Sequence, residues 1–276
     1  MRARQEEILF SQWLLQLGNG TLPSRQSPPF VEGIQIPDEC VEQNASITTS
    51  MYHGVSPDQF VSRVVLTPTN EDSLAVNEEV LQLLPGEEKI YDSADEVVSD
   101  GDDETDQYTV EFLNSITPSG MPPHRLKLKV GAVVMLLRNL DLKKGLCNGT
   151  RLVVKALHNK VIDAEVVTGV ASGKRVFIPR IQLTPSDTGL PFILSRRQFP
   201  LRLAYSMTIN KAQGQTFEKV GLYLQRPCFS HGQLYVAFSR ARAFADIKVK
   251  ILETTQQGRY QGKYYTQNIV YRQVLL

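Results

Sequence analysis

The chain has 276 residues, enough for one large or two modest domains, and an ordinary globular composition with a net charge of +1. No apolar run approaches the roughly 20 residues that span a bilayer, and the first 20 residues do not resemble a signal peptide, so we expect an intracellular protein without a membrane partner. Cys40, Cys147 and Cys228 form no CxxC pair and have no suitably spaced His, which argues against a disulfide framework or a structural metal site and predicts buried or half-buried thiols.

The N-terminal third predicts a helix and a β-turn-α unit. Residues 4–17 carry apolar side chains at helical spacing, and Gly18-Asn19-Gly20 is a typical helix stop. After a Pro-rich passage, residues 62–70 combine a β-branched run with a Thr-Pro-Thr-Asn turn. Residues 71–84 then have helical periodicity, with Glu71 and Asp72 near the helix start.

An acidic segment follows. Residues 92–106 hold eight acids and no Lys or Arg, so they bury too little apolar surface to order themselves, and we expect a solvated loop. A second interpretation is a regulatory segment that competes with nucleic acid for the basic part of the chain.

Short strands separated by turn signals predict a small β-barrel over residues 126–179. Asn148-Gly149 and Ser172-Gly173 mark two tight turns. Residues 169–176 (GVASGKRV) imitate a phosphate loop, but the first Gly is one residue too close and Arg175 replaces Ser or Thr, so we interpret them as a barrel hairpin.

A β-α alternation resumes at Leu201 and predicts strands at 201–206, 219–224 and 247–252, with helices at 209–215 and 230–241. The expected fold is therefore an α/β domain with a mostly parallel sheet, interrupted by the small barrel. The predicted organisation is 1–124 and 199–276 as the two parts of the α/β domain, and 125–198 as the insertion.

Charge is divided unevenly along the chain. Residues 1–124 hold 5 Lys and Arg against 22 Asp and Glu, whereas residues 125–276 hold 25 against 7. A basic C-terminal part attracts polyanions, because each cation that meets a phosphate releases counterions. A basic surface that only maintains solubility is the alternative.

The stretch YSMTINKAQGQTF (205–217) follows a predicted strand end, where parallel sheets bind ligands. Lys211 offers a point charge for phosphate, Thr208 and Asn210 offer neutral donors, and Gly214 lets a backbone N–H approach an oxygen closely. The alternative is an ordinary polar helix start capped by Thr208.

A second basic motif, HGQLYVAFSRARA, covers residues 231–243. On a helix, Leu234, Ala237 and Phe238 face the sheet and leave Gln233, Arg240 and Arg242 near the exposed side. Arg240 either stabilises the helix end or is held toward a γ-phosphate as an arginine finger. Tyr205, Phe217 and Tyr235 are candidates for base stacking, but core positions are the favoured interpretation.

Four segments in order carry a family resemblance: LTPTN (66–70), EFLNSITPSGMPPHRLKLKVGAVVMLLRNLDLKKGLCNGTRLVV (111–154), FPLRLAYSMTINKAQGQTF (199–217) and GQLYVAFSRA (232–241). Together they resemble the C-terminal half of Pif-one family DNA helicases, especially Helitron-type versions. The resemblance implies the second RecA-like motor domain of a superfamily-one, 5′-to-3′, ATP-dependent helicase, of the kind that unwinds DNA in repair, recombination or telomere maintenance. It also implies that the insertion is a Src-homology-type barrel that guides DNA.

The resemblance also implies residue roles. Thr208, Asn210 and Lys211 would touch single-stranded DNA, Gly214 and Thr216 would face the triphosphate, and Arg240 would be the catalytic arginine finger. The family's phosphate loop GxxxxGK[ST] and Asp-Glu strand, which hold ATP and Mg²⁺, do not occur in the sequence, and Arg242 departs from the family pattern.

Two functions follow from these departures. In the first, the chain is part of a helicase whose ATP and Mg²⁺ require a missing N-terminal motor domain, so that the chain alone binds single-stranded DNA and hydrolyses no ATP. In the second, it is a nucleic-acid-binding module that has lost the motor. A third interpretation treats the barrel as a protein-interaction domain, without salt-sensitive DNA binding.

Overall fold

The computed structural model describes residues 5–98, 108–185 and 189–271. The chain forms two compact units, one from Met1–Leu83 and Tyr205–Leu276 and the other from Leu84–Ala204. We call them the first and the second unit. The second unit is larger than the expected insertion at 125–198, because strands N-terminal to residue 125 pair with strands inside it.

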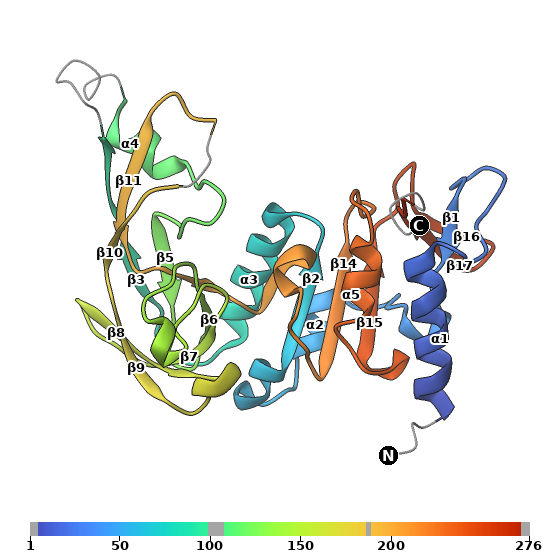
Figure 1. The fold of residues 1–276 in the computed structure, drawn as a ribbon, viewed down its shortest axis with the longest axis horizontal. Helices are drawn as coiled ribbons and strands as arrows, with labels where there is room; N and C mark the ends of the chain where they lie inside the picture. Colours follow the sequence, from blue (N-terminus) through green and yellow to red (C-terminus); the bar gives the residue numbers. More distant parts are fainter. Residues whose placement is uncertain (1–4, 99–107, 186–188, 272–276) are drawn as a thin grey trace. The chain divides into compact units, whose positions relative to one another are not determined.

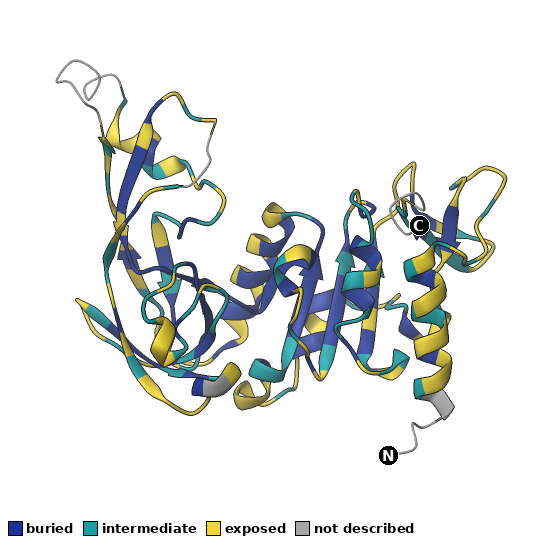
Figure 2. Ribbon diagram, viewed as in Figure 1, coloured by how far each residue is buried: buried dark blue, intermediate teal, exposed yellow. Residues whose placement is uncertain are grey.

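A four-stranded parallel sheet organises the first unit. Its order is β13 (Ser206–Thr208), β2 (Arg63–Thr67), β14 (Lys219–Leu224) and β15 (Ile247–Ile251), and every ladder is parallel. The sequence prediction of a mostly parallel sheet is thereby confirmed for this unit. Such sheets are buried on both faces, which explains the apolar runs of β2 and β14 (Figure 2). The edge strand β15 instead alternates buried apolar residues with Lys248 and Lys250.

Helices cover both faces of this sheet. On one face, α1 (Gln5–Asn19) and α5 (Gln233–Phe238) bring Phe10, Leu17 and Phe238 against Val64, Leu66 and Leu222 of the strands. On the other face, α2 (Ile47–Tyr52) packs on β14, where a Cβ at Gly221 would lie 3.0 Å from Met51 Cγ. Figure 1 shows α5 in front of the strands and α2 behind them.

The remaining elements of the first unit connect these layers. The helix α3 (Asn70–Leu83) follows β2 directly and confirms the predicted β-turn-α unit. A small antiparallel sheet joins β1 (Gly33–Gln35), β17 (Lys263–Gln267) and β16 (Gly258–Tyr260). Short 3₁₀ helices complete the unit: η1 (Asp38–Cys40), η2 (Pro57–Ser62), η6 (Ile209–Ala212) and η7 (Phe244–Asp246).

A five-stranded antiparallel sheet forms most of the second unit. Its order is β12 (Leu201–Leu203), β6 (Val133–Leu136), β7 (Arg151–Leu157), β8 (Val161–Val166) and β9 (Arg175–Pro179). The short helices η4 (Leu142–Lys144) and η5 (Gly169–Ala171) lie in its connections. Residues 169–176 do form the connection into β9, as predicted. In the described residues β12 and β9 are the sheet's two edges, so closure into a barrel stays a prediction.

Two smaller sheets and a helix complete the second unit. One sheet pairs β3 (Lys89–Asp92) with β5 (Arg125–Leu128), and the other has the order β10 (Ile181–Leu183), β11 (Ile193–Gln198) and β4 (Ala94–Val98). The helix α4 (Val110–Ser115) begins at Thr109, whose hydroxyl accepts a hydrogen bond from Phe112 N.

The prediction of an acidic loop over 92–106 is wrong for residues 94–98, which form β4. Asp95 sits opposite Arg196 in the β4–β11 ladder, and their side chains are both fully buried with an Nη2–Oδ2 distance of 2.6 Å. Arg196 lies 101 residues further along the chain, and its positive charge neutralises the buried Asp95 carboxylate. The composition of residues 92–106 alone predicts that this carboxylate is solvated. Residues 99–106 of the predicted loop lie outside the described residues.

The C-terminal elements also differ from expectation in length. The predicted strand 201–206 is two strands, β12 in the second unit and β13 in the first. The helix expected over 209–215 is only the 3₁₀ turn η6, because the connection from β13 to β14 has ten residues and Gly214 adopts φ +82°. The helix expected over 230–241 contracts to α5. No helix in the described parts of the chain is long and apolar enough to cross a membrane.

Candidate functional site

The carboxyl edge of the parallel sheet carries the first candidate residue. Thr208 ends β13 beside Thr67, the last residue of β2, and the two are register partners. The Thr208 side chain makes no cap hydrogen bond to η6, so the alternative role of an ordinary helix cap is not what the structure has. Thr208 is largely buried at this edge, with 9% of its surface exposed.

The turn that follows, residues 209–216, alternates anchors with exposed polar groups. Ile209 and Ala212 are buried in the core of the first unit and fix η6 to the sheet. Asn210, Gly214 and Thr216 are exposed, and Lys211 is half-buried. Gly214 has open space where a Cβ would stand, so its side of the turn is accessible. Four of the six predicted site residues, Asn210, Lys211, Gly214 and Thr216, therefore lie on this one turn.

Arg240, just past α5, reaches this turn with its guanidinium. Its Nη1 donates to Gln215 O at 2.8 Å and to Ala212 O at 3.4 Å. In the other direction, Phe217 N donates to Arg240 O at 3.1 Å. The structure thus brings Arg240 and the 209–216 turn together within the first unit, so the two basic motifs of the sequence, 205–217 and 231–243, are in contact.

The same side chain also contacts its own helix end. Arg240 Nε donates to Val236 O at 3.1 Å, and Nη2 donates to Ser239 Oγ at 2.9 Å. Stabilisation of the helix end, the alternative left open by the sequence, is therefore present beside the contacts with the turn. Arg242 is exposed.

One expected surface residue is buried. Gln233, the first residue of α5, is 2% exposed and accepts a hydrogen bond from Phe229 N at 3.0 Å. The helix begins after Gly232 at φ +66°, which turns Gln233 inward. The interpretation of Tyr205 and Phe217 as core residues is confirmed by their burial, whereas Tyr235 is 40% exposed and lies against Gly18 of α1.

Two residues that the sequence analysis missed, Asn77 and Tyr52, hold the backbone that leads into the candidate site. Asn77 of α3, 2% exposed, accepts hydrogen bonds from Tyr205 N and Ser206 N and donates to Ser206 O, each at 2.9 Å. Tyr52 donates to Tyr205 O at 2.8 Å. They fix the backbone where β13 begins. The available signal was an Asn on the apolar face of a predicted helix, one position from Val76.

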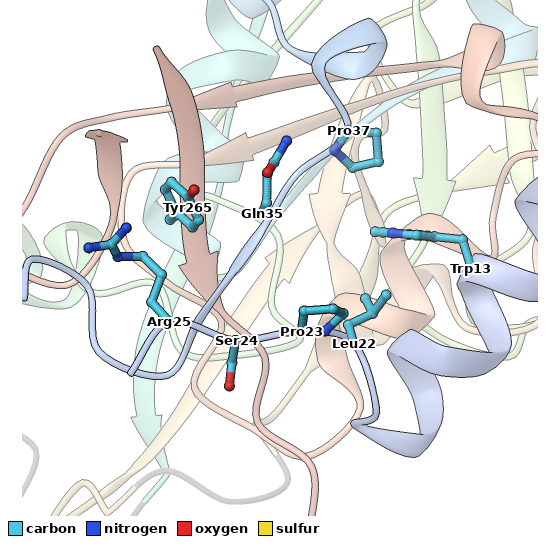
Figure 3. Close-up of a pocket in the computed structure, with 8 residues that line it drawn as sticks. All are labelled: Trp13, Leu22, Pro23, Ser24, Arg25, Gln35, Pro37 and Tyr265. Atoms are coloured by element: carbon cyan, nitrogen blue, oxygen red, sulfur yellow. The ribbon is translucent and has the colours of Figure 1, made fainter. Parts of the chain in front are cut away.

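A separate hollow of about 450 Å³ lies between α1 and the small antiparallel sheet (Figure 3). Figure 3 shows Trp13 and Pro37 on one side of it and Tyr265 on the other. Arg25 is held by its own neighbours, since Nε donates to Pro29 O at 2.8 Å and the guanidinium stacks on Tyr260. The hollow includes none of the predicted site residues. The described residues contain no group of three or more His, Cys, Asp or Glu arranged to hold a metal ion.

Comparison with known proteins shows which family this chain resembles. The family model described as DNA helicase Pif1, 2B domain, matches residues 111–157, within the second unit. The ATP-dependent DNA helicase PIF1 of Danio rerio is 31% identical over 220 residues, which cover 80% of this chain. The chain is homologous to part of the Pif1 DNA helicases. The PIF1 of Xenopus laevis is 35% identical over 182 residues, or 66% of this chain.

The match covers a minor part of these relatives. The chain spans 32% of the Danio rerio PIF1 and 26% of the Xenopus laevis PIF1. Similarity to a Helitron-type subgroup stays a prediction.

Solved Pif1 structures share the fold. A Bacteroides Pif1 bound to ssDNA has a TM-score of 0.62 and 24% identity, with 98% of this chain and 57% of that chain covered. A Bacteroides Pif1 in complex with ADP-AlF4 has a TM-score of 0.51 and 28% identity, with 92% and 51% covered.

Proposed function

We propose that this chain supplies the C-terminal part of an ATP-dependent, 5′-to-3′ DNA helicase. The observation that carries the proposal is the contact between Arg240 and the 209–216 turn at the carboxyl edge of a parallel sheet, in a chain homologous to Pif1. In this proposal the first unit is a RecA-like motor domain, and the second unit contains a Src-homology-type domain that guides DNA.

On the DNA side, Thr208, Asn210 and Lys211 contact the sugar-phosphate backbone of a single strand. Asn210 is exposed and Lys211 is partly so, and both project from a turn whose buried residues anchor it to the sheet. Neutral donors and one ammonium suit phosphate oxygens and carry no base preference. This arrangement fits a motor that must move along any sequence.

On the nucleotide side, Gly214 and Thr216 face the triphosphate and Arg240 contacts the γ-phosphate. Gly214 has the accessible backbone that this role requires, and Arg240 is a preorganised cation of the type that stabilises charge in phosphoryl transfer. The sequence holds no GxxxxGK[ST] loop, and the described residues offer no metal-binding cluster. ATP and Mg²⁺ are therefore assigned to a first motor domain that residues 1–276 do not include.

ATP hydrolysis tests this assignment. We expect no hydrolysis by the purified 276-residue chain, and hydrolysis stimulated by single-stranded DNA when a separately produced Pif1-type first motor domain is added. Arg240→Ala should then lower the rate by a factor on the order of 10³ or more, the usual effect of removing an arginine finger. Hydrolysis by the chain alone that Arg240→Ala abolishes would contradict the division of the site between two domains.

A nucleic-acid-binding module without a motor is the second candidate, favoured by the lack of a phosphate loop in the sequence. The two candidates differ in the coding sequence that adjoins residue 1. An in-frame phosphate loop and Asp-Glu strand there support the helicase, and their lack in the full-length transcript supports the module. A nuclear site of action is part of both proposals.

A further inference from the structure

Most N–H groups of the Arg240 guanidinium donate hydrogen bonds to backbone and side-chain groups of the first unit. A guanidinium has five N–H donors in a rigid planar fork. Nε contacts Val236 O, Nη1 contacts both Ala212 O and Gln215 O, and Nη2 contacts Ser239 Oγ. These four contacts leave one Nη2 hydrogen for another acceptor.

The two carbonyls on Nη1 flank the most exposed part of the turn. Ala212 is the last residue of η6, and Gln215 follows Gly214 at φ +82°. Within the turn, Gln215 N donates to Ala212 O at 3.0 Å, Gln213 N donates to Asn210 O at 3.4 Å, and Gln215 Nε2 donates to Lys211 O at 3.4 Å. A short 3₁₀ turn next to a glycine is intrinsically weak, so an outside group that ties both of its ends has a large influence on its shape.

We propose that Arg240 is a positioning residue for DNA binding: it holds the 209–216 turn in the shape that presents Asn210 and Lys211 to a nucleic-acid strand. The inference rests on the proposed function for the DNA contacts, and it goes beyond the arginine-finger role because it operates without nucleotide. The remaining Nη2 hydrogen can meet a phosphate while Nη1 keeps the turn. One guanidinium then connects the nucleotide side and the DNA side of the first unit.

The test compares DNA affinity across variants of the 276-residue chain in nucleotide-free buffer. The probe is a fluorescein-labelled oligo-dT strand, read by fluorescence anisotropy at low salt. We expect Arg240→Ala to raise Kd by about tenfold and Arg240→Lys by several-fold, since one ammonium cannot bridge both carbonyls. Arg259→Ala removes the same charge from an exposed residue of β16, in a different sheet, and should change Kd by less than about twofold.

A double-mutant cycle separates positioning from direct contact with DNA. If Arg240 acts through Lys211, Lys211→Ala should cost much less affinity in the Arg240→Ala background than in the parent chain. Additive losses would show that Arg240 does not act through Lys211 and would overturn the positioning role.

Hydrogen exchange supplies a readout that does not depend on DNA. Amides 210–217 should exchange at least several-fold faster in Arg240→Ala and Arg240→Lys, with the rest of the first unit unchanged. If the parent chain fails to bind oligo-dT, the proposed function fails and exchange alone decides the positioning role. Unchanged exchange in both variants overturns it. Arg240→Lys keeps the test usable if Arg240→Ala does not fold.

Discussion

Asn77 satisfies three backbone groups at the point where the polypeptide enters β13. Its carbonyl accepts from two successive amides, and its amide donates to Ser206 O, all inside the core of the first unit. A buried amide group without a partner costs about 1–3 kcal/mol, more than a formed hydrogen bond contributes. The position therefore favours Asn on energetic grounds, because only Asn and Gln carry both a carbonyl and an NH2 group, and Gln is one methylene longer.

Asn77→Ala should lower the free energy of unfolding of the first unit by about 2–4 kcal/mol, since it leaves three buried backbone groups without the side chain that paired them. Asn77→Asp keeps the acceptors but turns a carboxylate oxygen toward Ser206 O in a buried site, so its loss should be at least as large. Urea denaturation measures both. Glu71→Gln, an exposed change at the start of the same helix, should cost less than about 0.5 kcal/mol. A loss for Asn77→Ala no larger than this control would contradict the stabilising role of the Asn77 hydrogen bonds.

The three thiols differ in accessibility. Burial raises the pKa of Cys228 to about 12, and burial, with Glu39 nearby, raises the pKa of Cys40 to about 12 as well. Cys147 is half-buried. At pH 8 both buried groups are therefore protonated thiols, and the thiolate is the reactive form.

Titration with a coloured disulfide reagent at pH 8 should modify Cys147 first and leave Cys40 and Cys228 unmodified until denaturant is added. Peptide mapping identifies the labelled residue. Rapid labelling of Cys228 in the native chain would show that the packing around this residue is looser than described.

Among the elements, strand β4 depends on one buried ion pair. Arg196 of β11 binds both Asp95 oxygens, through Nε at 2.9 Å and Nη2 at 2.6 Å, and donates to the carbonyls of Pro122, Leu113 and Ile116. The guanidinium therefore joins β4, the end of α4 and the 116–122 segment. Fully satisfied networks of this kind specify an arrangement more than they stabilise it.

Asp95→Ala should destabilise the second unit by about 3–5 kcal/mol, because it leaves a buried guanidinium without its counter-charge. Arg197→Met removes the neighbouring exposed arginine of β11 and should have little effect. Replacing both partners, as in Asp95→Leu with Arg196→Met, should recover part of the loss. Thermal denaturation of the variants makes the comparison, and equal stability of Asp95→Ala and Arg197→Met would contradict the account.

Local pattern predicted the elements whose cause is local. The apolar periodicity of α1 and α3, the β-branched run of β2 and the apolar residues of β14 and β15 are local features of the sequence, and each of these elements appears in the structure. It failed at β4, where order depends on the distant Arg196. It also failed at η6, where a short crossover and Gly214 prevent a full helix.

The sequence indicated which motifs could form a site, but not the contacts between them. Lys211 and Gly214 lie in one basic motif and Arg240 in the other, and the structure bonds Arg240 to the turn that carries the first motif. The functional roles of these residues stay predictions. That Arg240 binds the carbonyls of Ala212 and Gln215, and that Asn77 supports Tyr205 and Ser206, follows only from the tertiary arrangement. Sequence spacing contains no information on either.

For the whole molecule, folding redistributes the charge. The acidic and basic halves of the sequence do not become acidic and basic units: the first unit holds 14 Lys and Arg against 14 Asp and Glu, and the second holds 16 against 15. A bulk electrostatic attraction to polyanions is therefore weaker than the sequence halves suggest. The proposed DNA binding therefore relies on local groups such as those on the 209–216 turn.

The most direct test of the account is the salt dependence of single-stranded DNA binding by the purified 276-residue chain and its Lys211→Ala variant. We predict that the parent chain binds oligo-dT with an affinity that falls as salt rises, and that Lys211→Ala weakens binding and lowers the slope of log K against log salt by about one unit. Binding by the parent chain with an affinity and slope that Lys211→Ala leaves unchanged would contradict a DNA contact at this turn.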